Sequence, residues 1–378
     1  MILIVFILYL GIVAYISTKY KLTLKLFNLN AILLLLLICL RGYDNGSVDT
    51  INYIDWVLNK ANSMYAVADE RGTIESGYAF YIHILQSFVE NGTVFLFINT
   101  ILSLLPLYYL VKKNSENLHI SLFLFFLPLT NIHRMYFVCQ RQILGLSIVL
   151  IGIILFTEIG KNYLKWIAII ISSAIAFTLQ RFSILLPILF VAFYYVNINK
   201  KGYIGSIVVT LIAGVLLGGI TNFSFLADIY LHVSEFHQLQ RYAEAVIRDT
   251  NVNLMQAVVG SLLGVCFALY SKPSILNHIY GKMFLVSVII FNLMSSVQEV
   301  YRIAGIFTIF GLIVLPKTLQ FMIRQKKINL ITISLWLTFA FSAYSYLKTL
   351  YAIDSGELPI ATDSLVPYEF FWEDKYTY

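Results

Sequence analysis

Apolar segments alternate with short polar turns along almost the whole chain. A membrane-spanning helix needs about 20 mainly apolar residues to cross roughly 30 Å of hydrocarbon. By this measure the pattern predicts about twelve spans, over Met1–Ser17, Leu26–Leu40, Val94–Val111, Leu118–Asn131, Ile143–Phe156, Leu164–Leu179, Phe182–Val196, Tyr203–Ile220, Leu254–Tyr270, Met283–Val297, Ile303–Leu319 and Ile328–Tyr346.

Two apolar stretches need a separate assignment, because each could be something other than a membrane span. Gly77–Val89 is apolar but short, and it is bounded by Glu75 and Glu90, which favours an interfacial or re-entrant helix over another span. Met1–Ser17 has neither a basic segment before it nor an A-x-A-like cleavage site, so we expect a retained first helix.

Composition narrows the class of protein. Of the 378 residues, 59% are hydrophobic and 12% are charged, and the mean hydropathy is +0.80. Soluble domains carry about 25% charged residues, so a water-soluble fold could not cover so apolar a core. The 7 Pro, 20 Gly and 3 Cys exclude collagen, disordered and disulfide-rich classes. The prediction is an all-α polytopic membrane protein whose three cysteines are buried and unpaired.

The lysines predict the orientation of these spans. Lys residues follow alternate spans, at Lys19, Lys112, Lys161, Lys200 and Lys272 among others. Positive charge collects on the cytoplasmic side, so both termini are expected outside, in the periplasm of an inner membrane. The whole chain, 1–378, is then a single integral membrane domain. Its outer side holds a loop over 41–93 with the interfacial helix, a loop over 221–253 and a tail over 348–378.

Arginine does not follow the distribution of lysine. Of the nine arginines only Arg324 is expected on the inner side, and the net charge of +6 is therefore mainly a signal for membrane orientation, not for nucleic acid. A guanidinium offers a rigid fork of donors for phosphate or carboxylate, whereas Lys is a flexible point charge. The outer arginines therefore predict an anion-binding function.

Four arginines lie at the outer ends of predicted spans, and charge at membrane depth usually faces a cavity or a partner. These four, expected to bind a diphosphate, are Arg134, Arg141, Arg181 and Arg302. Arg41, Arg241, Arg248 and His133 are expected to make secondary substrate contacts. The alternative is structural: the side chains reach outward to lipid headgroups, or pair as Glu299 with Arg302 could.

Outer carboxylates are the candidates for catalysis. Transfer of a sugar needs a base for the acceptor hydroxyl and stabilisation of the departing phosphate. The candidate catalytic residues are Asp44, Asp49, Glu75 and Glu299. His232 and His237 are poorly spaced for zinc, so we expect no metal site, and we expect no cofactor because nucleotide-binding motifs are absent.

The chain carries several short motifs whose order resembles that of the Wzy-type oligosaccharide repeat-unit polymerases, especially the EpsG-like branch. They are Arg41-Gly42-Tyr43-Asp44 with Asp49 and Tyr53, Glu75-Ser76-Gly77-Tyr78, Arg141-Gln142, the segment around Arg302, and Val366-Pro367-Tyr368. The pairs Arg134/Gly145 and Arg141/Gly152, each with ten residues between, resemble a motif described for such polymerases. One departure is Arg181-Phe182-Ser183, where relatives commonly carry His-x-Ser.

The resemblance implies a GT-C-like helical fold and a glycosyltransferase-type enzyme. Such an enzyme moves a growing O-antigen, capsule or exopolysaccharide chain from undecaprenyl diphosphate to an incoming lipid-linked repeat unit, at the periplasmic face. The expected partners are this lipid-linked oligosaccharide, membrane lipids and a chain-length regulator. The alternatives are a flippase for lipid-linked oligosaccharides, an O-antigen ligase and a non-enzymatic scaffold. A flippase predicts charged or broken positions near mid-bilayer, whereas here the charges collect at one face.

Overall fold

The computed structural model describes residues 2–42, 48–59, 74–126, 132–221, 254–294 and 300–325, and every regular element in these ranges is a helix. The chain divides into two compact units, and the division falls within α11 (Leu185–Tyr194). The first unit holds α1 (Ile2–Lys19), α2 (Leu24–Cys39), α3 (Val48–Leu58), α5 (Ser76–Gln86), α6 (Gly92–Asn114), α7 (Leu118–Phe125), α8 (Ile132–Val138), α9 (Gln140–Glu158), α10 (Asn162–Leu179) and the 3-10 turn η2 (Arg181–Ile184).

The second unit packs three long helices against one another. Its elements are α12 (Lys200–Thr221), α15 (Leu254–Tyr270), α16 (Pro273–Leu276), α17 (Ile279–Leu293), α18 (Val300–Thr308) and α19 (Gly311–Arg324). A buried polar cluster joins α12, α15 and α17: Ser261 donates to Asn292, and Asn292 donates to the Ile207 carbonyl. Such satisfied polar contacts hold helices together in hydrocarbon, where apolar packing alone gives little preference.

Helix lengths agree with a membrane protein but not with every predicted span. Among the described residues α6, α9 and α10 are long and apolar enough to cross a membrane, and α18 with α19, bent by 60°, would be a fourth. The predicted span Ile303–Leu319 is therefore a bent pair, and Phe182–Val196 begins with a 3-10 turn. The twelve spans and the outer termini stay predictions, and Ile328–Tyr346 lies outside the described residues.

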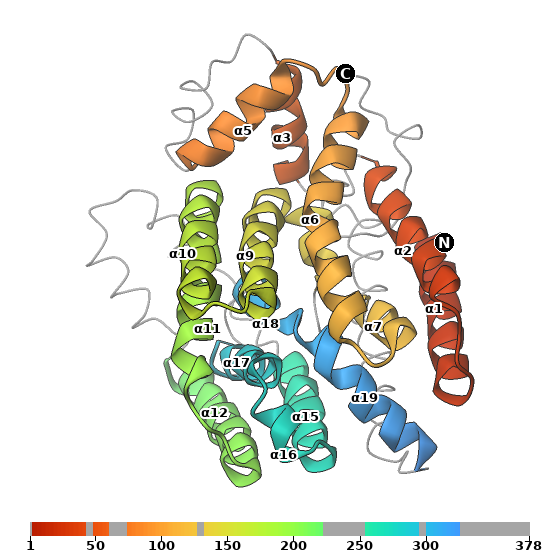
Figure 1. The fold of residues 1–378 in the computed structure, drawn as a ribbon, viewed down its shortest axis with the longest axis vertical. Helices are drawn as coiled ribbons and strands as arrows, with labels where there is room; N and C mark the ends of the chain where they lie inside the picture. The colour runs from red at the N-terminus through yellow and green to blue at the C-terminus, as the bar shows by residue number, and fades with distance from the viewer. Residues whose placement is uncertain are drawn as a thin grey trace. The chain divides into compact units, whose positions relative to one another are not determined.

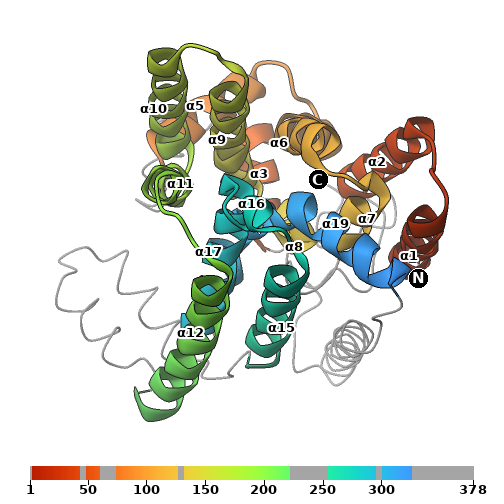
Figure 2. The ribbon, with the colours of Figure 1, turned by 60° about the horizontal axis from the view of Figure 1, so that its bottom comes forward.

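In the first unit α9 and α10 pack closely side by side (Figures 1 and 2). Small residues allow this: a Cβ on Gly145 would lie 2.5 Å from Ser183 Oγ, and one on Gly152 would lie 2.7 Å from Ser172 Cβ. Glycine at these points lets the two backbones approach, as is common between membrane helices. The approach brings the end of α10, and η2 after it, against the start of α9.

The two ends of these helices differ in charge. At one end Lys113 Nζ, on α6, lies 2.5 Å from Glu158 Oε1, on α9, and Tyr109 donates to the same carboxylate. At the other end α5 runs across the end of α10 (Figure 1). The first end carries the lysines predicted to be cytoplasmic, so the end that carries α5 corresponds to the side predicted to be periplasmic.

Candidate functional site

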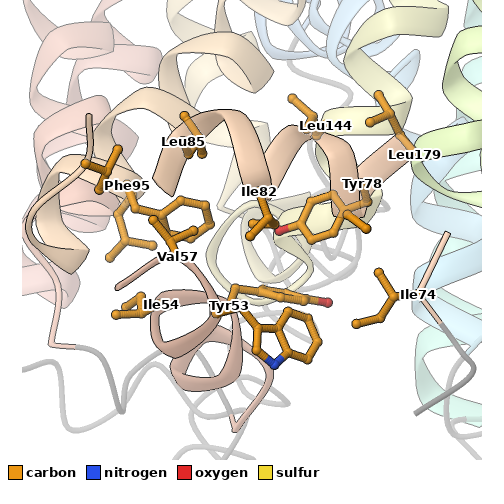
Figure 3. Packing of buried hydrophobic residues seen from close by; sticks show 14 residues of the cluster. Tyr53, Ile54, Val57, Ile74, Tyr78, Ile82, Leu85, Phe95, Leu144 and Leu179 are labelled. Carbon is orange, nitrogen blue, oxygen red and sulfur yellow. The ribbon is translucent and has the colours of Figure 1, made fainter. Parts of the chain in front are cut away.

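The short helix α5 is held by an apolar cluster under it. Tyr78, Ile82 and Leu85 of α5 are buried against Tyr53 and Val57 of α3, as Figure 3 shows. The remaining members include Phe95, Leu144 and Leu179, from α6, α9 and α10. Burying each such side chain contributes about 1.5–3 kcal/mol, so the cluster fixes α5 on these three helices.

Polar contacts complete this support. Gln86 Nε2 donates to the Trp56 carbonyl at 2.8 Å, which ties the end of α5 to α3. Tyr81 donates to Asn99 Oδ1 at 3.2 Å, and burial raises the pKa of Tyr81, so the phenol remains a donor. The helix predicted over Gly77–Val89 is therefore present as α5. Its eleven residues are too few to cross a membrane.

Gly77 brings the start of α5 against the end of α10. A Cβ at this position would lie 2.7 Å from both Thr178 Cβ and the Thr178 carbonyl oxygen, so only glycine permits this approach. Glu75 occupies the N-cap position of α5, yet its side chain makes no capping hydrogen bond. The carboxylate therefore points to neighbouring elements instead of its own helix.

Glu75 joins two of the predicted arginines. Its Oε2 lies 2.9 Å from the NH1 nitrogen of Arg141, in the first turn of α9. Its Oε1 accepts the backbone N–H of Arg181 at 3.1 Å. The Glu75 side chain is 9% exposed and that of Arg141 17%, so the pair is largely shielded from water and its Coulombic attraction is screened less than that of a surface ion pair.

Arg181, whose backbone N–H meets this pair, also carries a cationic side chain. Its side chain is exposed, and its guanidinium makes no ion pair with any residue of the described ranges. Two residues on, Ser183 is fully buried, and its Oγ faces Gly145 without a hydrogen-bond partner in the described part of the chain. The segment Arg181-Phe182-Ser183 thus supplies an accessible cationic side chain on a residue whose backbone N–H meets Glu75.

Arg41, predicted to contact substrate, is fully buried. Its two terminal nitrogens donate to the Ile38 carbonyl at 2.5 Å and to the Phe137 carbonyl at 2.6 Å. Beside it Asn99 donates to Gln140 Oε1 at 2.6 Å. Asn99 and Gln140 were not predicted as site residues; the available signal was an amide inside the apolar stretch Val94–Val111 and another next to Arg141.

The other predicted residues are placed as follows. Arg134 and His133 lie on α8, and Asp49 lies on α3; the His133 ring stacks on Phe126, with the ring centroids 6.2 Å apart. Arg302 lies on α18 of the second unit and is half-buried. Asp44, Arg241, Arg248 and Glu299 lie outside the described residues, so their predicted roles stay predictions.

The His, Cys, Asp and Glu side chains of the described residues form neither a metal site nor a disulfide. Within the described ranges no group of three or more His, Cys, Asp or Glu side chains gathers to form a metal site. Cys39, Cys139 and Cys266 are buried and unpaired, as predicted from their positions in or beside apolar segments. What gathers at this end of the first unit is a carboxylate between a paired and an exposed arginine.

Taken together, the apolar helices indicate a helical membrane protein, and a carboxylate and two arginines lie together at one end of its first unit. A model of the EpsG family matches residues 24–370, which is nearly the whole chain, and the protein belongs to the EpsG family. No curated protein and no solved structure matches the chain. Family membership indicates a polymerase-like role in the biosynthesis of exopolysaccharide or O-antigen, in a membrane.

Proposed function

We propose that this protein is a Wzy-type polysaccharide polymerase of the bacterial inner membrane. It would transfer the growing chain from undecaprenyl diphosphate to the sugar of an incoming lipid-linked repeat unit at the periplasmic face. The observation that carries the proposal is the Glu75–Arg141 pair with the exposed Arg181 beside it. A carboxylate that can take a proton, next to cations that can hold a diphosphate, is the set of groups this reaction needs.

Arg141 and Arg181 would bind the donor diphosphate. A guanidinium binds phosphate oxygens through two parallel hydrogen bonds, and Arg141 also lies in the first turn of α9, where the helix dipole favours an anion. The diphosphate would replace the Glu75 carboxylate on Arg141, because it carries more charge and more acceptor oxygens. The freed carboxylate then lies beside the bound donor.

Glu75 would then activate the acceptor. The acceptor hydroxyl oxygen forms a bond to C1 of the donor's first sugar while the bond from C1 to the phosphate oxygen breaks. The hydroxyl proton passes to Glu75, and undecaprenyl diphosphate leaves with the electron pair. Arg141 and Arg181 stabilise the charge that develops on the leaving phosphate, as oriented cations do in phosphate chemistry.

The first test is a deletion examined by polysaccharide gel. A single repeat unit on the lipid core is the result expected for a polymerase. Naked core would indicate a flippase or a ligase and would overturn the proposal. For an exopolysaccharide, the corresponding result is accumulation of the lipid-linked single repeat unit without polymer.

The second test replaces site residues in the complemented deletion. Arg141→Lys keeps the charge but loses the donor fork, so we expect chain length to collapse, with a loss of about 100-fold in transfer rate. Glu158→Gln is the matched control, because Glu158 is also an ion-paired carboxylate but lies at the opposite end of α9. Normal chains from Arg141→Lys would contradict the assignment of the site.

A further inference from the structure

The arginine at the end of α2 faces backbone and not the charged site. Arg41 is fully buried, and its guanidinium donates to carbonyls in the last turns of two helices, Ile38 of α2 and Phe137 of α8. The last carbonyls of a helix have no partner within it, and a cation there also complements the helix dipole. One guanidinium therefore satisfies carbonyls at two helix ends, one of them 96 residues further along the chain from Arg41.

This contact lies at the break that positions Arg141. Between α8 and α9, Cys139 leaves the helical conformation with φ −92° and ψ 60°, and Arg141 follows two residues later. The Arg41 guanidinium also lies over the Phe137 ring, 5.6 Å from its centroid, a cation–π contact that fixes the same corner. A buried charge without such partners is costly, so the folded state keeps Arg41 in contact with the break between α8 and α9.

A second contact holds the residue next to Arg141. Asn99 of α6 donates to Gln140 Oε1, and Tyr81 of α5 donates to Asn99. The backbone before Arg141 is thus fixed from α2 by Arg41 and from α6 by Asn99, while its side chain is fixed by Glu75. Precise placement of a binding group by supporting contacts is what preorganised sites require.

We propose that Arg41 is a positioning residue that acts through Arg141. It holds the α8–α9 corner so that the Arg141 guanidinium meets the donor diphosphate, and it does not bind substrate itself. This inference rests on the proposed function, and it replaces the substrate contact expected for Arg41 from the sequence. The residue type of Arg41 is compatible with a substrate contact, but its burial against two backbone carbonyls favours a positioning role.

A double-mutant cycle on the full-length protein in lipid nanodiscs tests it, with farnesyl diphosphate binding as the readout. In the wild-type background Arg41→Lys should weaken binding about 10-fold, since Lys cannot reach both carbonyls. In the Arg141→Gln background the same change should weaken it less than about 2-fold, because coupled residues are not additive. Arg324→Lys, at an exposed arginine at the end of α19, is the control and should change nothing.

The outcomes separate the inference from the proposed function. If Arg141→Gln weakens binding but Arg41→Lys costs the same factor in both backgrounds, Arg41 contacts the ligand or acts only on folding, and the inference is overturned alone. If Arg141→Gln leaves binding unchanged, the proposed function is overturned, and so is the inference, because it rests on diphosphate binding by Arg141. Should Arg41→Lys not fold, Phe137→Leu decides, since it removes only the ring under the guanidinium and should show the same dependence on Arg141.

Discussion

At the scale of single residues, the protein uses arginine for two different purposes. Arg141 and Arg181 flank a largely buried carboxylate at one end of the first unit, whereas Arg41 is buried among backbone carbonyls. The same side chain suits both because its fork of donors matches phosphate, carboxylate and paired carbonyl oxygens. Residue type therefore indicates the chemistry available at a position, and the surroundings decide which partner it meets.

Removing the charge of Glu75 should strengthen donor binding while it abolishes transfer. Glu75 competes with phosphate for Arg141, so Glu75→Gln should bind farnesyl diphosphate about 10-fold more tightly, yet yield only single repeat units on a polysaccharide gel. Glu75→Asp, which keeps the charge, should bind like the wild type. Weaker binding by Glu75→Gln would show that Glu75 serves to hold Arg141 in place.

Adding one methyl group at Gly145 should disturb the site through Ser183. The new Cβ would lie 2.5 Å from Ser183 Oγ, so Gly145→Ala should lower the free energy of unfolding by about 1–3 kcal/mol, as overpacking does. Combining it with Ser183→Gly should restore the thermal midpoint measured in detergent. No recovery in the double variant would mean that the strain lies elsewhere along α10.

At the scale of elements, the arrangement depends on close approaches between helices. Gly77 and Gly145 let α5 and α9 meet the end of α10, and the apolar cluster around Tyr78 and Tyr53 holds α5 there. At the opposite end of α9, Lys113 of α6 pairs with Glu158. The helices therefore work as a rigid frame, with the charged site at one end only.

The Lys113–Glu158 pair makes a pH-dependent contribution to the stability of the folded protein. The hydrogen bond from Lys113 lowers the pKa of Glu158 below its unfolded value of 4.5, so the contribution is present above that pH and is lost as the pH falls through the folded pKa. Lys113→Gln should lower the thermal midpoint slightly at pH 7, because exposed pairs contribute little. At pH 3 the variant and the wild type should differ less; an equal difference at both pH values would exclude this origin.

At the scale of the whole molecule, charge separates the two ends of the first unit. The end with Lys113 and Lys161 fits the cytoplasm, and the end with Glu75 and Arg181 fits the periplasm, because lysine collects on the inner side. A lipid-linked sugar presented outside the membrane would meet the second end. This orientation is predicted from the distribution of lysine, and the proposed periplasmic reaction requires it.

Cysteine labelling in intact cells measures this orientation directly. A membrane-impermeant maleimide should label Ser76→Cys, an exposed position at the start of α5, but not Lys161→Cys, an exposed position before α10. The three native cysteines are buried and should give little background. Labelling of Lys161→Cys alone would place the Glu75 site in the cytoplasm and contradict the proposed periplasmic reaction.

Much of the architecture was predictable because its causes are local in sequence. Apolar segments, the short helix after Glu75 and the separation of lysine from arginine depend on composition within windows of about 20 residues. The bend between α18 and α19 and the break at Cys139 were not predicted. Both lie within or beside apolar sequence, and hydropathy does not report backbone direction.

By itself the sequence predicted an all-helical membrane protein and the residue types available at the outer ends of the predicted spans. Only the tertiary structure decided which of them meet. Glu75 reaches Arg141 and the Arg181 amide because Gly77 lets α5 cross α10, although Glu75 and Arg181 are 106 residues apart. The Arg41 guanidinium donates to the carbonyl of Phe137, a residue remote in sequence. Ion pairs and helix caps depend on distances of a few ångströms between remote segments, and those distances are set by packing.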